Sequence, residues 1–120
     1  FLLLSPNSYN SLGVGTSQLY NKTVVYNHKR HGIFKLGNRN FEFRIKPRFP
    51  KKLHKEFLFV DLLNNLDSLA ENKSEVLANA EKQLPLFELA KLEKSVMAYG
   101  AGRTKKRVSS WLRNPQRVSA

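Results

Sequence analysis

The segment from Tyr99 to Arg113 holds residue types that bind phosphates and unpaired bases. Two glycines, Gly100 and Gly102, precede a run of basic residues, and glycine lets a backbone approach a phosphate closely. Lysine and arginine side chains donate hydrogen bonds to phosphate oxygens. The rings of Tyr99 and Trp111 can stack on bases, which is worth about 1–3 kcal/mol per base. The segment indicates nucleic-acid binding, with a solvated basic tail as the alternative.

Charge is sorted along the chain. Residues 1–55 contain eleven Lys and Arg against one acid, residues 56–100 contain eight acids against four Lys, and residues 101–120 contain six basic residues and no acid. The net charge is +12 on 120 residues, and a chain this basic repels itself unless a polyanion neutralises it. We expect the two basic ends to bind RNA through Lys29, Arg30, Arg39, Arg44, Lys46, Arg48, Lys51, Lys52, Arg103, Lys105, Lys106, Arg107, Trp111, Arg113 and Arg117.

Other kinds of site have less support in the sequence. His28 and His31 have the spacing of metal ligands, but with one further histidine, His54, and no cysteine we expect no metal site. The acids of the middle segment stand at helical spacings among lysines, which indicates a solvated helix face rather than a catalytic pair. Ser109 and Ser110 have no neighbouring base in the sequence to activate them. We therefore predict no catalysis, no cofactor and no small-molecule substrate.

The elements that must position the basic residues begin with β structure. Residues 23–26 have the composition of a short strand. Apolar and polar residues alternate over 33–36 and again over 41–45, and the Gly-Asn-Arg-Asn sequence between these runs favours a turn. A β-hairpin is therefore expected at residues 33–45. The odd-numbered residues of the second run share one face. We expect the aromatic side chains of Phe34, Phe41 and Phe43 in the core rather than as platforms for bases, because the ribonucleoprotein signature of an RNA-recognition sheet is absent.

Helical spacing follows the hairpin. Apolar residues recur on one face from Phe59 onward. Asn72 and Glu75 resemble a capping box at the start of a second helix, which Pro85 kinks or restarts. Gly100 is expected to end the helical region in the left-handed conformation.

The predicted fold class is a small, extended α+β structure. It consists of an N-terminal arm, a β-hairpin, two or three helices and a basic C-terminal tail. The predicted boundaries are 1–22 for the extended arm, 23–100 for a small hairpin-plus-helices domain and 101–120 for the basic tail.

The stretch from Tyr99 to Pro115 resembles the segment that opens the globular domain in the ninth small-subunit ribosomal protein family. That family has a Tyr-Gly-Thr-Gly-Arg-Arg-Lys-type segment, matched here by Tyr99, Gly100, Gly102, Arg103, Lys105 and Val108. The chain departs from the pattern at Thr104, Lys106 and Arg107, and it stops at Ala120, before the rest of that domain. The resemblance implies that Arg103 and Lys105 contact ribosomal RNA. It also implies that residues 1–98 correspond to the long extension of mitochondrial members.

Charge and resemblance together predict a structural constituent of a ribosome, with rRNA and neighbouring ribosomal proteins as partners. We expect a mitochondrial location, with an N-terminal presequence removed before Phe1; a chain boundary that is not the native one is the other interpretation. No transmembrane segment is expected. An accessory subunit of a large organellar complex, binding protein or anionic lipid, remains the alternative. A free DNA-binding protein is a third option, although no recognition helix is apparent.

Overall fold

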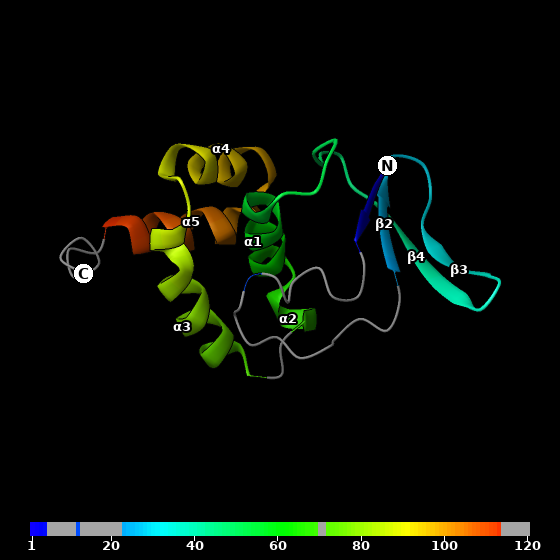
Figure 1. Ribbon diagram of the computed structural model, residues 1–120, viewed down its shortest axis with the longest axis horizontal. Helices are drawn as coiled ribbons and strands as arrows, with labels where there is room; N and C mark the ends of the chain where they lie inside the picture. The colour runs from blue at the N-terminus through cyan, green and yellow to red at the C-terminus, as the bar shows by residue number, and fades with distance from the viewer. Residues whose placement is uncertain (5–11, 13–22, 70–71, 114–120) are drawn as a thin grey trace.

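The structure is a computed structural model that describes residues 1–4, 12, 23–69 and 72–113. Four strands form one sheet at one end of the molecule, and the helices gather at the other (Figure 1). The strands are β1 (Leu2–Leu4), β2 (Thr23–Asn27), β3 (Gly32–Leu36) and β4 (Arg39–Ile45). The helices are α1 (Lys55–Asn64), α2 (Leu66–Leu69), α3 (Lys73–Gln83), the 3-10 turn η2 (Leu84–Leu86), α4 (Leu89–Tyr99) and α5 (Gly102–Arg113). The extents of 51 × 26 × 20 Å confirm the small, extended α+β fold.

The sheet has the order β1-β2-β4-β3, and its central pair, β2 and β4, is parallel. β3 and β4 form the predicted hairpin, but its turn is tighter than expected because β4 begins at Arg39. Gly37 takes φ 64°, which turns the chain in two residues and lets Arg39 pair with Leu36. The parallel pairing places the C-terminal ends of β2 and β4 side by side, with Asn27 opposite Ile45.

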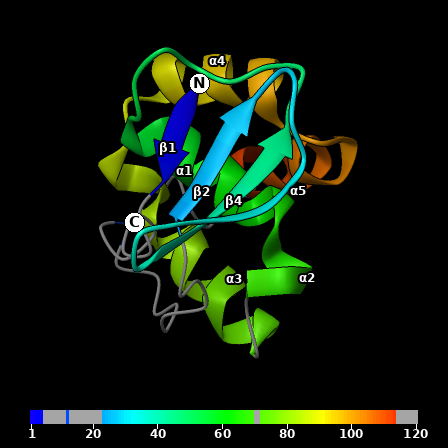
Figure 2. The same ribbon diagram turned by 90° about the vertical axis from the view of Figure 1, so that its right-hand side faces the viewer.

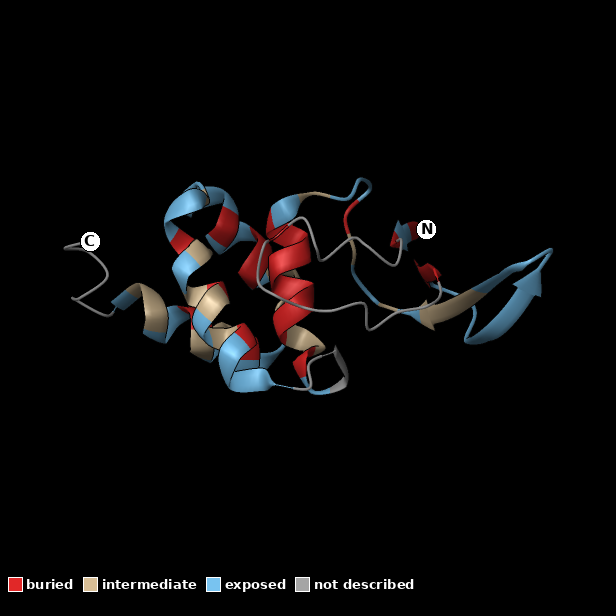
Figure 3. Ribbon diagram, turned by 60° about the horizontal axis from the view of Figure 1, so that its bottom comes forward, coloured by how far each residue is buried: buried red, intermediate tan, exposed pale blue. Residues whose placement is uncertain are grey.

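The core lies between the sheet and the helices, with α1 at its centre (Figure 3). Phe59, Leu62 and Leu63 belong to the predicted apolar stripe, and each is fully buried. Phe57 and Val60 are buried as well, so α1 is covered around its whole circumference rather than along one stripe. The sheet covers one side of this helix, while α4 and α5 contact it elsewhere.

One face of the sheet packs on the helices. Val24 and Tyr26 of β2 and Leu2 and Leu4 of β1 belong to the buried cluster that also contains α1. The hydroxyl of Tyr26 donates to the carboxylate of Asp61 in α1, with oxygen–oxygen distances of 3.0 and 2.8 Å. This buried contact fixes the sheet against the central helix.

The second helical region begins as the sequence predicts. The side chain of Asn72 accepts a hydrogen bond from the backbone N–H of Glu75, at 3.1 Å, and so caps the N-terminus of α3. The proline at position 85 lies in the 3-10 turn η2, where the chain changes direction before α4.

The segment expected as a basic tail is a helix over residues 102–113. Thr104 and Val108 are buried, and their four-residue spacing places both on the face that packs toward α1 and α4. Gly100 ends α4 as predicted, but its φ of −73° and ψ of 135° are extended rather than left-handed. The position needs glycine for space, since a Cβ there would lie 2.5 Å from the carbonyl oxygen of Val96.

Candidate nucleic-acid interface

Two basic loops meet at one end of the sheet because β2 and β4 run parallel. The backbone N–H of Lys46, just after β4, donates to the carbonyl oxygen of Asn27 at 2.9 Å. The rings of His28 and Phe49 stack at 4.7 Å, which joins the turn after β2 to the loop after β4. The exposed cations of these two loops, here called the basic edge, are Lys29, Arg30, Arg48, Lys51 and Lys52.

Asn27 organises the turn that carries two residues of the basic edge. Its side-chain oxygen accepts hydrogen bonds from the backbone N–H groups of Lys29 and Arg30, at 2.9 and 2.7 Å. Its amide nitrogen donates to the carbonyl oxygens of Arg30 and Arg44, at 3.1 and 3.2 Å. The turn backbone is therefore held by hydrogen bonds, while the two basic side chains are exposed.

The side chains of the other three predicted N-terminal site residues do not join the basic edge. Arg44 points to the helix side of the sheet, where it pairs with Glu42 and is partly buried. Lys46 is half-buried, with its Nζ 5.2 Å from the centre of the Tyr26 ring. Arg39 is exposed at the opposite end of the hairpin. The structure thus gathers five of the eight predicted N-terminal residues.

The C-terminal basic residues are distributed around α5. Lys106 and Arg113 are exposed, Lys105 and Arg107 are half-buried, and Arg117 lies outside the described residues. Trp111 is half-buried and packs against the core, so its ring is not fully exposed for stacking on a base. In Figure 1, α5 and the β3–β4 hairpin lie on opposite sides of α1, so the two basic sets form separate surfaces.

Asp67 holds one of the predicted RNA contacts in α5. The Nη1 of Arg103 lies 3.0 Å from the Oδ2 of Asp67, and the Nζ of Lys73 lies 2.9 Å from its Oδ1. The hydrogen bonds from Lys73 and Arg103, with their charges, hold the pKa of Asp67 below its ordinary value. Arg103 therefore has an acidic partner that a phosphate must compete with.

The backbone around Gly100, between α4 and α5, is held by hydrogen bonds to Asn64. The side-chain oxygen of Asn64 accepts from the backbone N–H of Ala101 at 2.9 Å. Its amide nitrogen donates to the carbonyl oxygen of Tyr99, also at 2.9 Å. This α1 side chain therefore occupies backbone groups on both sides of Gly100 and closes the junction between α4 and α5.

The prediction that Phe34, Phe41 and Phe43 lie in the core is wrong. None of the three belongs to the buried cluster, and the strand register places them on the face of the sheet opposite Tyr26. The alternation of apolar and polar residues correctly places these rings and Glu42 on opposite faces of the hairpin. It does not predict which of the two faces meets the helices.

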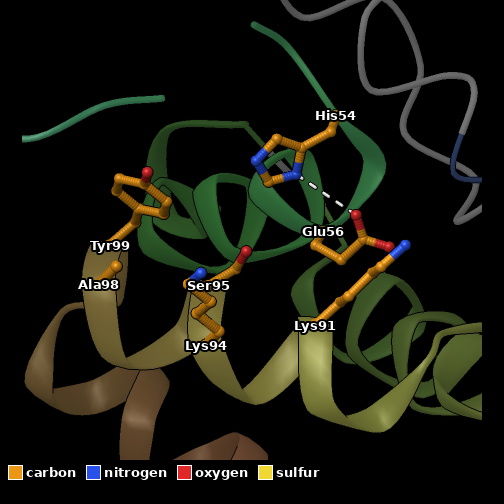
Figure 4. Close-up of a pocket in the computed structure, with 7 residues that line it drawn as sticks. All are labelled: His54, Glu56, Lys91, Lys94, Ser95, Ala98 and Tyr99. Carbon is orange, nitrogen blue, oxygen red and sulfur yellow. Dashed lines mark ion pairs between the residues drawn. The ribbon is translucent and has the colours of Figure 1, made fainter. Parts of the chain in front are cut away.

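A separate hollow of about 420 Å³ lies between the start of α1 and α4 (Figure 4). His54 is the N-cap of α1, and its Nδ1 accepts from the backbone N–H of Phe57 at 3.1 Å. The same Nδ1 lies 3.4 Å from Oε1 of Glu56. Ser95 and Tyr99 also line the hollow.

Comparisons with known proteins add no relative. No protein-family model, no curated protein and no solved structure matches the chain. Among the described ranges, no group of three or more His, Cys, Asp or Glu residues is placed to hold a metal ion. No helix within those ranges is long and apolar enough to cross a membrane.

Proposed function

We propose that this chain is a structural RNA-binding constituent of a ribosome, most simply the mitochondrial one. The observation that carries the proposal is the basic edge, where two loops from parallel strands present five exposed cations. None of the five makes an ion pair with an acid in the described part of the chain, where Glu42 pairs with Arg44 and Glu56 lies beside His54. Unpaired cations held on a rigid edge are suited to neutralise phosphates.

The shape of the basic edge favours RNA over the major groove of DNA. The cations stand on a turn and a loop rather than on one exposed face of a recognition helix. Loops at the end of a sheet can follow an irregular backbone surface, such as that of a folded rRNA. The ribosomal assignment itself is supported by the net charge of +12 and by the resemblance over residues 99–115.

Salt dependence of RNA binding tests this proposal. A labelled fragment of structured rRNA is titrated with the chain at salt concentrations from about 50 to 200 mM, and log Kd is plotted against log salt. Replacing Arg48, Lys51 and Lys52 with Ala should lower the slope by about 2–3, since each phosphate contact contributes about 0.7–0.9. The control replaces Lys82, Lys91 and Lys94 with Ala, which changes the net charge equally but on the exposed surface of α3 and α4.

Equal slopes for the two triple variants would contradict a phosphate-binding role for the basic edge. The ribosomal assignment has its own measurement, which is sedimentation of the chain with mitochondrial ribosomes. Release of the chain after nuclease digestion of the particle supports binding through rRNA. Retention after digestion would instead favour an accessory subunit held by protein contacts.

A further inference from the structure

The sheet has a second face that carries aromatic and aliphatic side chains. β4 presents Phe41 and Phe43 on this face, β3 presents Phe34 opposite Phe41, and β2 and β1 contribute Val25 and Leu3. Figure 2 shows β1, β2 and β4 in front of the helices, so this face is turned away from every described helix. We call it the aromatic face.

The three rings of the aromatic face are exposed or half-buried, and two of them contact each other. Phe34 is 39% exposed, and Phe41 and Phe43 are half-buried. Phe34 meets Phe43 edge to face, with centroids 5.3 Å apart and an interplanar angle of 89°. Two aromatic residues at alternate positions on β4 lie about 6.6 Å apart along the strand, so each can present its ring to a different base.

Positive charge borders the aromatic face. A hollow of about 460 Å³ lies over it, lined by Phe41, Phe43 and Val25 and also by Lys29 and Arg30 of the basic edge. The guanidinium carbon of Arg30 lies 5.9 Å from the centre of the Phe34 ring. The single acid of the hairpin, Glu42, points to the other face of the sheet and pairs with Arg44.

We propose that the aromatic face binds unpaired nucleotides of RNA. Phe34, Phe41 and Phe43 would stack on the bases, while Lys29 and Arg30 contact the phosphates of the same strand. This inference rests on the proposed function, because it requires that the RNA bound at the basic edge continue as a single strand over the aromatic face. Aromatic rings bordered by cations, with no acid among the described residues of the face, match the chemistry of single-stranded nucleic acid. A purely apolar protein segment would gain nothing from the cations.

Binding of a fluorescein-labelled ten-nucleotide oligoadenylate, measured by anisotropy against an RNA duplex of equal length, tests the inference. The wild-type chain should prefer the single strand. Phe41→Leu keeps an apolar side chain but removes the ring, and should weaken single-strand binding by about 5- to 100-fold while duplex binding stays within twofold. Ile33→Leu is the matched control, since its side chain is exposed on the opposite face of the same hairpin.

A second variant guards against loss of folding in the first. Lys29→Ala with Arg30→Ala alters exposed side chains without touching the backbone hydrogen bonds of the turn. It should weaken single-strand binding and lower the salt slope by about 1.4. A single 5-iodouridine within the oligonucleotide should cross-link to the peptide that contains residues 33–45.

The outcomes separate the inference from the proposed function. If Phe41→Leu and Phe34→Leu bind the oligonucleotide as tightly as the wild-type chain while the Arg48, Lys51 and Lys52 variant loses rRNA, the aromatic face is not a base platform and the basic edge stands. Such a result would leave a protein neighbour as the occupant of the face. If no RNA binds at any salt concentration, both proposals fail.

Discussion

The hydrogen bond between Tyr26 and Asp61 predicts a large effect from removal of one oxygen atom. Tyr26 is 1% exposed and Asp61 is 2% exposed, so neither group has free access to water. The Tyr26 hydroxyl lies 3.0 and 2.8 Å from the two carboxylate oxygens. Asn65 donates to the Tyr26 hydroxyl at 3.4 Å and to the carbonyl oxygen of Asp61 at 3.0 Å. Tyr26→Phe keeps the ring and deletes the donor to a buried acid.

The expected cost follows from the charge of the acceptor. A hydrogen bond to a charged group contributes about 1.5–3 kcal/mol, and Tyr26→Phe removes such a bond from the buried carboxylate of Asp61. We expect the free energy of unfolding to fall by about 1.5–3 kcal/mol. For a chain of 120 residues this corresponds to a decrease in Tm of roughly 6–12 °C. The ring of Tyr26 also packs edge to face on Phe57 at 6.3 Å, and Tyr26→Phe preserves that contact.

Urea unfolding followed by circular dichroism measures this effect. Tyr99→Phe is the matched control, because the ring of Tyr99 likewise packs on Phe57, at 5.2 Å, and no hydrogen bond joins its hydroxyl to a described residue. The control should stay within about 0.5 kcal/mol of the wild-type chain. A Tyr26→Phe variant as stable as the control would refute the view that this contact anchors the sheet to α1.

Two further predictions concern the junction between α2, α4 and α5. Gly100→Ala should lower the free energy of unfolding by about 1–3 kcal/mol, since its Cβ would lie 2.5 Å from the carbonyl oxygen of Val96. Gly102→Ala, where no atom lies within 4 Å of an added Cβ, should be neutral or stabilising by up to about 1 kcal/mol in urea unfolding. Because its cationic neighbours lower the pKa of Asp67 on folding, its stabilising contribution is present above about pH 3.9 and is lost as the pH falls below that value. Asp67→Asn should therefore lower Tm more at pH 7 than near pH 2.5, and an equal decrease at both values would contradict this sign.

The sequence predicted the local elements well because their signals are local. Alternation in residues 33–45 predicted the hairpin, and the apolar spacing from Phe59 predicted α1. The cap at Asn72 is formed by neighbours three residues apart. Each of these features depends on propensities within a few residues, which a sequence displays directly.

The sequence did not predict a helix for the basic C-terminal segment, because charged residues stand between its few apolar residues. Thr104, Val108 and Trp111 recur at helical spacing, yet one of them is polar and basic residues surround all three. Only a narrow strip of α5 packs against α1 and α4, so its apolar side needs few residues. A long basic side chain can lie beside such a strip with its stem on the apolar surface and its charge in water.

The parallel pairing of β2 and β4 explains both surfaces that we assign to RNA, and no local signal encodes it. It places the ends of β2 and β4 together, which joins the loops that begin at Asn27 and Ile45 into one basic edge. It also aligns Val25 with Phe43, so the apolar residues of two distant segments share one face. Had β2 paired antiparallel to β4, the turn with Lys29 and Arg30 would stand at the opposite end of the sheet from the loop after β4. The edge is therefore basic because the direction of β2 brings two basic loops together. Insertion of a single residue within β2 should shift its register, turn Tyr26 away from α1 and disrupt both surfaces together, which RNA binding and urea unfolding would report as one joint loss.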